Sequence, residues 1–506
     1  MKKHIFALSV FIQFSAYAYY EIPDAIPSPN AASLGTYGTI PVSLYTGTPD
    51  ISIPLYTFES RGLKLPVTLR YDAAGVKVNQ LPGWLGHNWS LEAGGVITRT
   101  IKERYDEYLP QDNSNALNYF QSYWLLDDYY DNQDVTSIAF NAQYHVYDLS
   151  PDIYHFNFMG YSGYFFLDHD GKWRVQSESN LDIIFDYTQE SNFIVPFIDH
   201  FPDQTMMPKT IKGFTIRDDK GYEYVFGGTA SAIEYTTPFF DMAEWNAMSW
   251  YLTKVRDMYG NVLYSFEYER GKYIMQIYYN DEYTESVGEL NGSGITYKFK
   301  SKVSPDFKFS IYFTSPVYLK RIKSSNGIAG TFQSCDNEDK DENGVDYMQT
   351  PRLFDRITIR DGQRITVDQL YGIMSLLAKS NPMVNNILFY YLSNYPHYYD
   401  PEIKQYIYKP DNTLPTNLLG RTRLRKLENI VFSLDTGSVF YNPGISYQFK
   451  YKYNGRMHLD QIQIKDAAGV LSGNEGTGIA GRYRFRYDHF GEMCSDYLTP
   501  ADHWGY

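Results

Sequence analysis

The stretch Ile445-Ser446-Tyr447-Gln448-Phe449-Lys450-Tyr451-Lys452-Tyr453 alternates between apolar or aromatic residues and polar ones. A period of two places the aromatic side chains on one face of a strand and the lysines on the other. Asn454-Gly455 follows, and this pair suits a type I′ hairpin turn because both residues tolerate positive φ. The same alternation occurs in 63–71 and in 307–313. These repeats of the pattern predict a mostly β protein of antiparallel, hairpin-rich sheets, built as a sandwich or as sheet-shell-like modules, with a few short helices.

The composition of the 506-residue chain favours the same fold class. Aromatic residues make up 17% of the chain, and 50 residues are tyrosine; such residues fit half-buried pleated surfaces and argue against disorder. The 45 basic and 59 acidic residues give a formal net charge of −14, so the basic footprint of a nucleic-acid-binding protein is absent. Two cysteines are too few for a disulfide framework.

The first 18 residues are typical of a secretory signal peptide. Lys2 and Lys3 precede the apolar run 5–14, which is too short to span a membrane as a helix. Ala16-Tyr17-Ala18 supplies small residues for cleavage after Ala18. No later apolar run reaches the length of about 18 residues that a transmembrane helix needs. We therefore expect a secreted or cell-surface protein without a transmembrane helix.

Export would place the two cysteines in a compartment that is often oxidising. Cys335 and Cys494 could then form a disulfide. Their separation in the sequence does not fix their geometry, so a pair and two free thiols both stay open.

Changes of composition divide the chain into β modules and one insertion. The acidic, Asn-rich stretch 111–150 interrupts the strand patterns, and the run 336–346 (DNEDKDENGVD) forms an acidic loop. The expected units are the signal peptide 1–18, an N-terminal β module 19–110, the insertion or loop 111–150, a β module 151–300 and a second β module 301–506.

Helical patterns are scarce. Residues 367–379 carry apolar side chains at helical spacing. Thr366 and Gln369 suit a capping box, and Asn381-Pro382 ends the helix. A weaker pattern predicts a second helix over 241–250.

The tetrapeptide Asp-x-x-Gly, followed by an aromatic-rich strand, recurs along the chain. It begins at Asp72, Asp168, Asp218, Asp257 and Asp466. The irregular spacing rules out a clean solenoid period. Two interpretations stay open: degenerate repeats, or a hairpin turn that any β protein uses again.

Motifs that carry catalysis are weak. Asp435-Thr436-Gly437 resembles half of an aspartic-protease site, but that chemistry needs two carboxylates that share a proton, and a second Asp-Thr-Gly is absent. A turn between strands is the alternative. The ten histidines show no His-Glu-x-x-His spacing, and no Gly-x-Ser-x-Gly elbow is present. We therefore predict no enzyme and no catalytic or cofactor-binding residue.

A possible calcium loop begins in the acidic run. Asp339, Asp341 and Asn343 alternate as oxygen ligands do, and Gly344 would allow the sharp turn. Position twelve is Thr350 where a bidentate Glu is expected, so a solvated acidic loop is the alternative. No metal ligand is predicted.

Several blocks of the chain resemble one family. The most specific is 84–99, WLGHNWSLEAGGVITR. Others are PSPNAASLG (27–35), IPVS (40–43), YTGTP (45–49), ISIPLY (51–56), PDI (151–153), FNF (156–158), GYSG (160–163), FTI (214–216), YVFG (224–227), WYLTK (250–254) and DHWGY (502–506). Together they are similar to the N-terminal region of the large secreted Rhs/YD-repeat proteins of Bacteroidetes-type bacteria.

The resemblance implies an exported β-rich scaffold that precedes a YD-repeat shell. In that family the Asp-x-Trp-Gly-Tyr motif is followed by repeats, a core and often a C-terminal toxin, which the shell can enclose. This sequence stops at Tyr506, inside the motif, so it resembles the leader alone, from a truncated gene or a fragment. Any toxin activity would lie beyond Tyr506.

The block 84–99 also makes local predictions. Trp84 and Trp89 are expected in the core, and Gly94-Gly95 suggests a close backbone approach or a bulge at a strand start. Asn88 stands where the family prefers Gly before the second Trp. Asn tolerates positive φ next best after Gly, so the turn is expected to survive.

The leading functional hypothesis is an exported, non-enzymatic β-rich scaffold or interaction region of an Rhs/YD-repeat protein, linked in relatives to interbacterial toxin delivery. The expected partners are a downstream YD-repeat shell and cell-envelope or glycan surfaces, with no nucleic acid and no cofactor. The alternatives are a surface glycan-binding protein, an outer-membrane β-barrel, and a hydrolase that uses Asp435.

Overall fold

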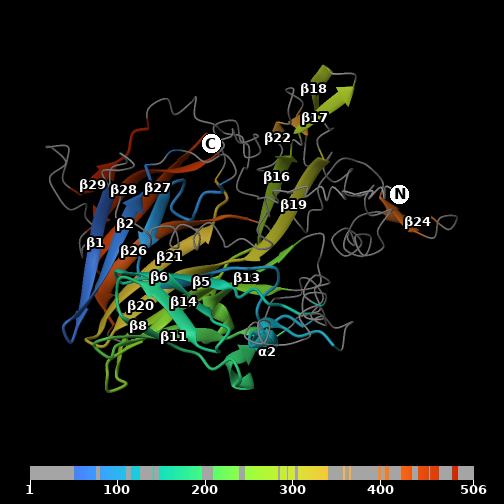
Figure 1. Cartoon of the computed structure of the whole chain (residues 1–506). Helices are drawn as coiled ribbons and strands as arrows, with labels where there is room; N and C mark the ends of the chain where they lie inside the picture. The colour runs from blue at the N-terminus through green and yellow to red at the C-terminus, as the bar shows by residue number, and fades with distance from the viewer. Residues whose placement is uncertain are drawn as a thin grey trace, which may run out of the picture.

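The computed structural model is a mostly β protein of large antiparallel sheets (Figure 1), which confirms the fold class expected from the sequence. The signal peptide, the helix expected over 367–379 and residues 340–346 of the acidic loop lie outside the described part of the chain. The described residues are 51–73, 75, 80–109, 115–125, 141, 147–195, 209–238, 245–282, 285–292, 295–302, 306–339, 357–358, 364–365, 397–400, 405–408, 423–435, 443–454, 456–465 and 481–487.

Two large sheets share the central strand β14 (Asn246–Arg256). The side sheet runs β7-β6-β5-β4-β14-β13-β19-β16. Its other strands are β4 (Gly95–Thr100), β5 (Ile153–Phe158), β6 (Tyr161–Leu167), β7 (Trp173–Ser177), β13 (Ile233–Pro238), β16 (Ile274–Glu282) and β19 (Asp306–Ser315).

The main sheet runs β8-β11-β12-β14-β15-β20-β21-β26-β27-β28-β29. Its other strands are β8 (Leu181–Ile184), β11 (Gly213–Asp218), β12 (Glu223–Gly227), β15 (Val262–Arg270), β20 (Val317–Ser324), β21 (Ile328–Asp336), β26 (Arg425–Leu434), β27 (Pro443–Tyr453), β28 (Met457–Lys465) and β29 (Arg482–Arg484). The two large sheets thus combine strands from all three of the expected β modules.

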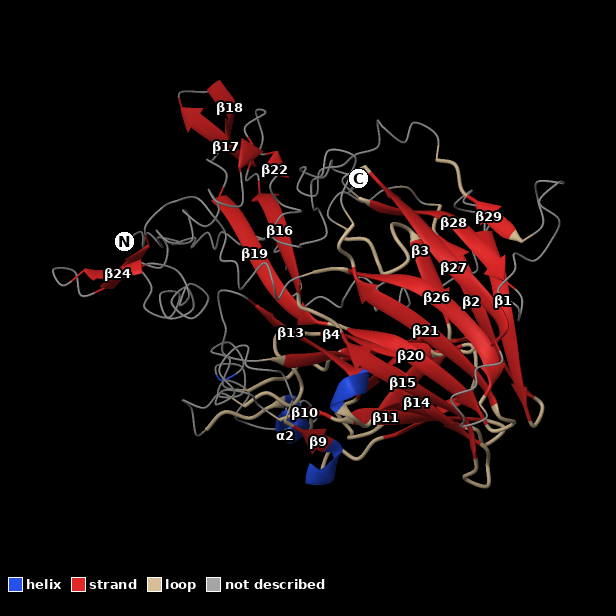
Figure 2. Ribbon diagram, turned by 180° about the vertical axis from the view of Figure 1, so that it is seen from behind, coloured by secondary structure: helices blue, strands red, loops and turns tan. Residues whose placement is uncertain are grey.

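A third, three-stranded sheet covers part of the main sheet (Figures 1 and 2). This cover sheet consists of β1 (Ile51–Ser60), β2 (Leu63–Tyr71) and β3 (Trp89–Glu92). The Tyr56 ring stacks on Phe432 of β26 at a centroid distance of 4.4 Å. The Tyr447 hydroxyl of β27 donates a hydrogen bond of 2.6 Å to the carbonyl of Leu55. The two sheets therefore pack face to face through aromatic side chains.

One buried apolar cluster runs through the three sheets. The alternation predicted for β27 is confirmed, because Tyr447 and Phe449 are buried and Lys450 is exposed. On β2, likewise, Leu65 and Val67 are buried between exposed neighbours. Most of the aromatic residues of these strands therefore serve as core.

The smaller elements lie outside the large sheets. Among the described residues, no helix is long and apolar enough to cross a membrane. These smaller elements are four strand pairs, one helix and two 3-10 turns: β9 (Phe193–Ile194) with β10 (Thr210–Ile211), β17 (Glu285–Gly292) with β18 (Ile295–Lys302), β22 (Ile357–Thr358) with β23 (Arg364–Ile365), β24 (His397–Asp400) with β25 (Gln405–Tyr408), the helix α2 (Tyr119–Ser122) and the 3-10 turns η1 (Glu190–Asn192) and η3 (Ala230–Ala232).

Three of the Asp-x-x-Gly tetrapeptides form the same hairpin turn, at β6–β7, β11–β12 and β14–β15. In each, the glycine has a positive φ and its N–H donates to the carbonyl of the Asp, with distances of 2.9 Å for Gly171–Asp168, 3.1 Å for Gly221–Asp218 and 2.9 Å for Gly260–Asp257. The Asp218 and Asp257 carboxylates also accept backbone N–H groups of their own turns. The aspartate thus acts as a turn acceptor. The turn at Asp72 is described only in part, and the one at Asp466 lies outside the described residues.

The helix expected over 241–250 is wrong for residues 245–250, since Trp245 is not helical and 246–250 form the first half of β14. The remaining residues, 241–244, lie outside the described part. Asn246–Trp250 pair with β13, and Ser249–Tyr251 pair with β4. Both faces of this half-strand are buried, and a strand buried on both faces loses the alternation that would have identified it.

Candidate functional site

The junction between the large sheets is a fork at β14. Ser249–Tyr251 pair with Val96–Thr98 of β4, in the side sheet. A few residues further, Lys254–Arg256 pair with β15 of the main sheet. Since β4 and β15 lie beside consecutive parts of one strand and then diverge, the two sheets separate at this point. The space between them needs filling by side chains.

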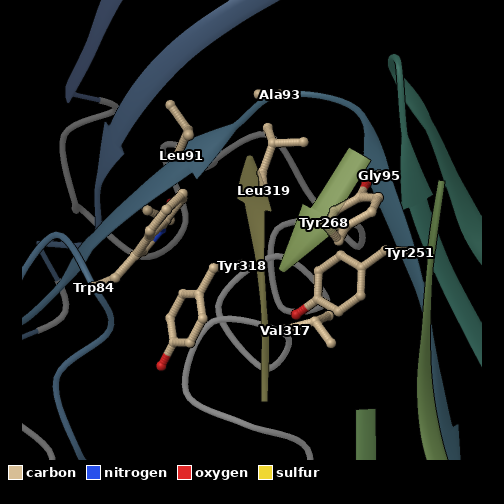
Figure 3. A pocket seen from close by; sticks show the side chains of 10 residues that line it. Trp84, Leu91, Ala93, Gly95, Tyr251, Tyr268, Val317, Tyr318 and Leu319 are labelled. Atoms are coloured by element: carbon tan, nitrogen blue, oxygen red, sulfur yellow. The ribbon is translucent and has the colours of Figure 1, made fainter. Parts of the chain in front are cut away.

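A small pocket lies at this fork (Figure 3). Its walls are mainly aromatic and apolar, and Figure 3 shows Trp84 and Tyr318 on one side of Leu319, with Tyr251 and Tyr268 on the other. The lining residues are Trp84, Ser90, Leu91, Ala93, Gly95, Tyr251, Tyr268, Val317, Tyr318 and Leu319.

The pocket is too small for a substrate. Its cavity volume is about 30 Å³, whereas ligand pockets have roughly 300–1,000 Å³. The Tyr268 hydroxyl donates a 2.7 Å hydrogen bond to the carbonyl of Leu252, which ties β15 to β14 beyond their paired residues. The Trp84 and Tyr318 rings lie 5.5 Å apart, and the Arg425 guanidinium lies 5.4 Å from the Tyr318 centroid. The aromatic side chains therefore fill the fork as packing.

The block 84–99 builds one wall of the fork as the sequence predicts. Trp84 and Trp89 are buried, which confirms their expected place in the core. Asn88 has a φ of 63°, so the positive-φ turn expected at this position is present with Asn. A Cβ on Gly94 would lie 2.9 Å from the Phe266 ring, and one on Gly95 would overlap Phe158. The close backbone approach expected at Gly94-Gly95 is confirmed.

A second junction is polar and lies beside the side sheet. We call Asp106, Glu107, Asp148 and Asp152 the carboxyl cluster. Arg99 of β4 is fully buried and is the cation at its centre. Its Nη1 donates to Glu107 Oε1 at 3.0 Å, a second Nη2–Oε2 contact makes the pair bidentate, and its Nε lies 2.8 Å from Asp152 Oδ2.

The cluster ties together the two ends of the connection between β4 and β5. The Asp106 N–H donates to Asp152 Oδ2 at 3.1 Å, and the Asp152 N–H donates to Asp106 Oδ1 at 2.9 Å. The Lys102 N–H donates to Asp152 Oδ1, and the Tyr154 hydroxyl donates to Asp106 Oδ2. The carboxyl groups thus satisfy backbone N–H groups that burial has removed from water.

Burial governs the protonation of this cluster. It raises the pKa of Asp106 to about 7, although Arg99 and two hydrogen bonds oppose the rise. It raises the pKa of Asp148 to about 8. It also holds the pKa of Asp152 well above the ordinary value, with the Asp106 carboxyl adding to the rise. The chemistry is that of a proton-holding structural network, and no group of His, Cys, Asp and Glu in the described part of the chain is arranged to hold a metal ion.

Two buried histidines form a third polar feature. His87 of the 84–99 block and His458 of β28 have ring centroids 5.9 Å apart. Burial is the main cause that lowers the pKa of His87 well below its ordinary value and that of His458 to about 4, and Arg456 adds to both. His458 Nε2 lies 3.0 Å from Asn454 Oδ1. Both rings are therefore neutral at pH 7.

The residues singled out by sequence motifs do not come together. Asp435 follows β26, where its Oδ1 pairs with Arg321 at 2.9 Å. Asp339 accepts a 2.6 Å contact from Lys426 and a hydrogen bond from Tyr453, whereas Asp341 and Asn343 lie outside the described residues. The two alternatives, a calcium loop and a solvated acidic loop, therefore both stay open.

Cys335 lies half-buried in β21, while Cys494 lies outside the described part, so a disulfide and two free thiols both stay open. Burial raises the pKa of the Cys335 thiol to about 12, which makes it a poor nucleophile at neutral pH.

Sequence reasoning missed the carboxyl cluster. Asp106 and Asp152 are 46 positions apart, on opposite sides of an insertion, and no spacing rule connects them. The only local signal was Arg99, a charged residue in an otherwise apolar alternation after Gly94-Gly95.

Comparison with known proteins gives little further information. No family model and no curated protein matches the sequence. Among solved structures, the chain is similar to the crystal structures of TcdB2-TccC3 and TcdB2-TccC3-TEV, with TM-scores of 0.31 and identities of 9% and 12%. Each alignment covers 88% of this chain and 16% of the other. The chain thus spans about one sixth of the length of these proteins.

Proposed function

We propose that the chain is an exported, non-enzymatic β scaffold, the N-terminal part of an Rhs/YD-repeat protein at the cell surface or outside the cell. One observation carries this proposal. The block 84–99, which is the most specific part of the sequence resemblance, lies where the cover sheet, the side sheet and the main sheet meet. Its tryptophans and glycines are occupied in packing.

The state of the reactive side chains supports a role without catalysis. The carboxyl cluster binds backbone N–H groups and Arg99. His87 and His458 are buried and neutral, and the pocket at the fork has a volume of only about 30 Å³. A scaffold needs these groups for stability, whereas an enzyme needs some of them exposed to a substrate.

The partner that we propose is a downstream YD-repeat shell. The last described strand of the main sheet, β29, pairs with β28 through Gln461–Gln463. Its three residues are exposed, and among the described residues no strand pairs with its other edge. An edge of this kind can continue a sheet by adding a strand. Any part in interbacterial toxin delivery would come from that shell and its cargo.

Export is tested by expressing the whole chain in a bacterial host and sequencing the N-terminus of the exported protein. We expect it to begin at Tyr19, and an Ala18→Asp variant to remain uncleaved. A protein that stays in the cytoplasm with residues 1–18 attached would contradict export.

Shell binding is tested by mixing the mature protein with a purified YD-repeat polypeptide and measuring the complex by size-exclusion chromatography. The Phe485 N–H donates to the carbonyl of Asp460 in β28, so the N–H of the preceding Arg484 faces the free edge of β29. We expect a complex that the Arg484→Pro variant fails to form, because proline removes a donor from that edge and leaves the pairing with β28 in place. Tyr259→Ser, at an exposed turn on β14–β15, is the control and should bind normally. Equal binding by all three proteins would rule out the β29 edge as the contact.

A further inference from the structure

The carboxyl cluster has more acidic groups than its one buried cation can neutralise. Arg99 contacts Glu107 and Asp152 directly. Asp106 and Asp148 have no such ion pair among the described contacts, and both are buried to within 1% of full burial. An ionised carboxylate in this position would lack both water and a cation, which is costly.

The hydrogen bonds of Asp148 also fit a protonated group. Its Oδ1 accepts the Ser150 N–H at 3.2 Å. Its Oδ2 is buried and has no hydrogen-bond partner among the described residues. An oxygen buried without a partner costs less in a neutral carboxyl than in a carboxylate, because the carboxylate also carries a charge that burial has removed from water.

The charged and titratable groups around the cluster come from every element packed against it. They are Arg99 of β4, Glu103, Arg104 and Glu107 after β4, Tyr119 of α2, and Tyr154 of β5. Apart from Arg99, only Arg104 is cationic, and its field opposes the proton on Asp148. Burial and the mutual repulsion of the acidic groups therefore determine whether Asp106 and Asp148 keep their protons.

The cluster holds two arms of the chain, residues 101–109 and 147–152. Besides the reciprocal bonds of Asp106 and Asp152, the Asp148 N–H donates to the carbonyl of Leu117, and the Asn118 side chain donates to the carbonyl of Glu107. The two arms and α2 are thus joined around the buried carboxyls, and of these bonds only the reciprocal ones of Asp106 and Asp152 involve groups that titrate.

We propose that these two arms form a pH-dependent latch, which is closed when Asp106 and Asp148 carry protons and is loosened when both are ionised. Opening exposes the two carboxyls to water, where their pKa returns to about 4. The open state therefore binds fewer protons than the closed state across the range from about pH 4 up to the raised values in the closed state. Within that range, each group makes opening about tenfold easier per pH unit.

The pH profile should be steepest where both groups hold protons in the closed state. There the opening constant should rise by at least about one-hundredfold per pH unit, since the pKa of Asp152 is raised as well. As the pH passes the raised pKa values, fewer groups release a proton on opening, so the rise should become shallower.

The test is native-state hydrogen exchange of the whole chain from pH 5 to pH 9, with each rate corrected for the intrinsic pH dependence of exchange. The reporters are the amides of Lys102, Asp106 and Asp152, which donate to the cluster. The paired amides of β20 and β21 are the internal reference and show that the body of the protein stays folded. We expect the protection of the reporters to fall with pH while the reference changes little.

The isosteric variant Asp148→Asn removes one titrating group and keeps the shape. Over the range in which Asp148 is protonated in the closed state, the opening constant of the variant should rise about tenfold less per pH unit than that of the native chain. Asp182→Asn, on the exposed side of β8, should behave as the native chain does. Reporter protection that follows the reference at every pH, or an Asp148→Asn profile identical to the native one, would overturn the latch.

Discussion

The carboxyl cluster and the pair formed by His87 and His458 are both buried, but they depend on pH in opposite directions. Burial raises the pKa of Asp106 and Asp148, and it lowers the pKa of both histidines. The cause is the same in each case, because removal from water disfavours the charged form, which is the base of a carboxyl and the acid of an imidazole.

The signs follow from which state holds the proton. The carboxyls hold protons in the folded state that they lose on unfolding, so their stabilisation is complete below about pH 4 and is lost as the pH rises toward 7 and 8. The histidines gain protons on unfolding, so their contribution is complete above about pH 6.5 and is lost as the pH falls toward 4. Between about pH 4 and pH 6.5 the two contributions to the free energy of unfolding change in opposite directions. The free energy of unfolding of the whole protein should therefore vary less with pH than either contribution does.

Arg99→Ala should produce the largest effect and should do so at the carboxyl cluster. It removes the one cation that contacts Glu107 and Asp152 and leaves both buried. We expect the free energy of unfolding at pH 7 to fall by about 5 kcal/mol, measured by urea denaturation. The control is Arg174→Ala, since Arg174 pairs with Asp168 and Asp170 at the surface and should cost less than about 1 kcal/mol. Equal losses would mean that the cluster is exposed to solvent.

Trp89→Ala should produce the next largest effect, close to the buried pair formed by His87 and His458. Trp89 is buried, and its Nε1 donates to the Tyr487 hydroxyl, whose ring lies 5.3 Å from His458. We expect a loss of about 4 kcal/mol from the cavity and the lost hydrogen bond. Trp124→Ala is the matched control, because Trp124 is 47% exposed. A soluble Trp89→Ala protein that melts as the native chain does would remove Trp89 from the core.

His458→Gln should separate the two pH dependences. Glutamine retains a polar group near Asn454 but does not titrate. In the native chain, His458 takes up a proton on unfolding at pH 5. Its contribution to the free energy of unfolding is therefore about 2 kcal/mol lower at pH 5 than at pH 7. The variant should lack this change. Its free energy of unfolding should therefore fall more steeply than that of the native chain as the pH rises from 5 to 7, because only the carboxyl groups then act. A variant and a native chain with parallel pH profiles would show that His458 does not titrate on unfolding.

The difference between these regions also explains how far the sequence could predict the structure. Alternation identified β2 and β27, and the block 84–99 predicted the buried tryptophans, the turn at Asn88 and the glycine contacts, because each of these features is local. The carboxyl cluster and the histidine pair depend on residues far apart in the chain, which only the strand pairing brings together. The helix expected over 241–250 failed for a related reason, since tertiary burial on both faces of β14 removed its local signal.

Asn88 lies between His87 and Trp89 in the sequence, and its substitution is the most local test with the smallest expected effect. Its φ of 63° is costly for a residue with a branched β carbon. Asn88→Val should lower the free energy of unfolding by about 1–2 kcal/mol at every pH, measured by urea denaturation at pH 5 and pH 8. Asn88→Gly is the matched control and should stay within about 1 kcal/mol of the native chain. Glycine adopts positive φ without strain, and the variant loses the exposed hydrogen bond to the Gly75 carbonyl and the side-chain hydrogen bond with Tyr71. If the valine variant changed the pH profile as well as the stability, the turn would be positioning His87 for its buried, neutral state, and the backbone strain and the titration would be one effect.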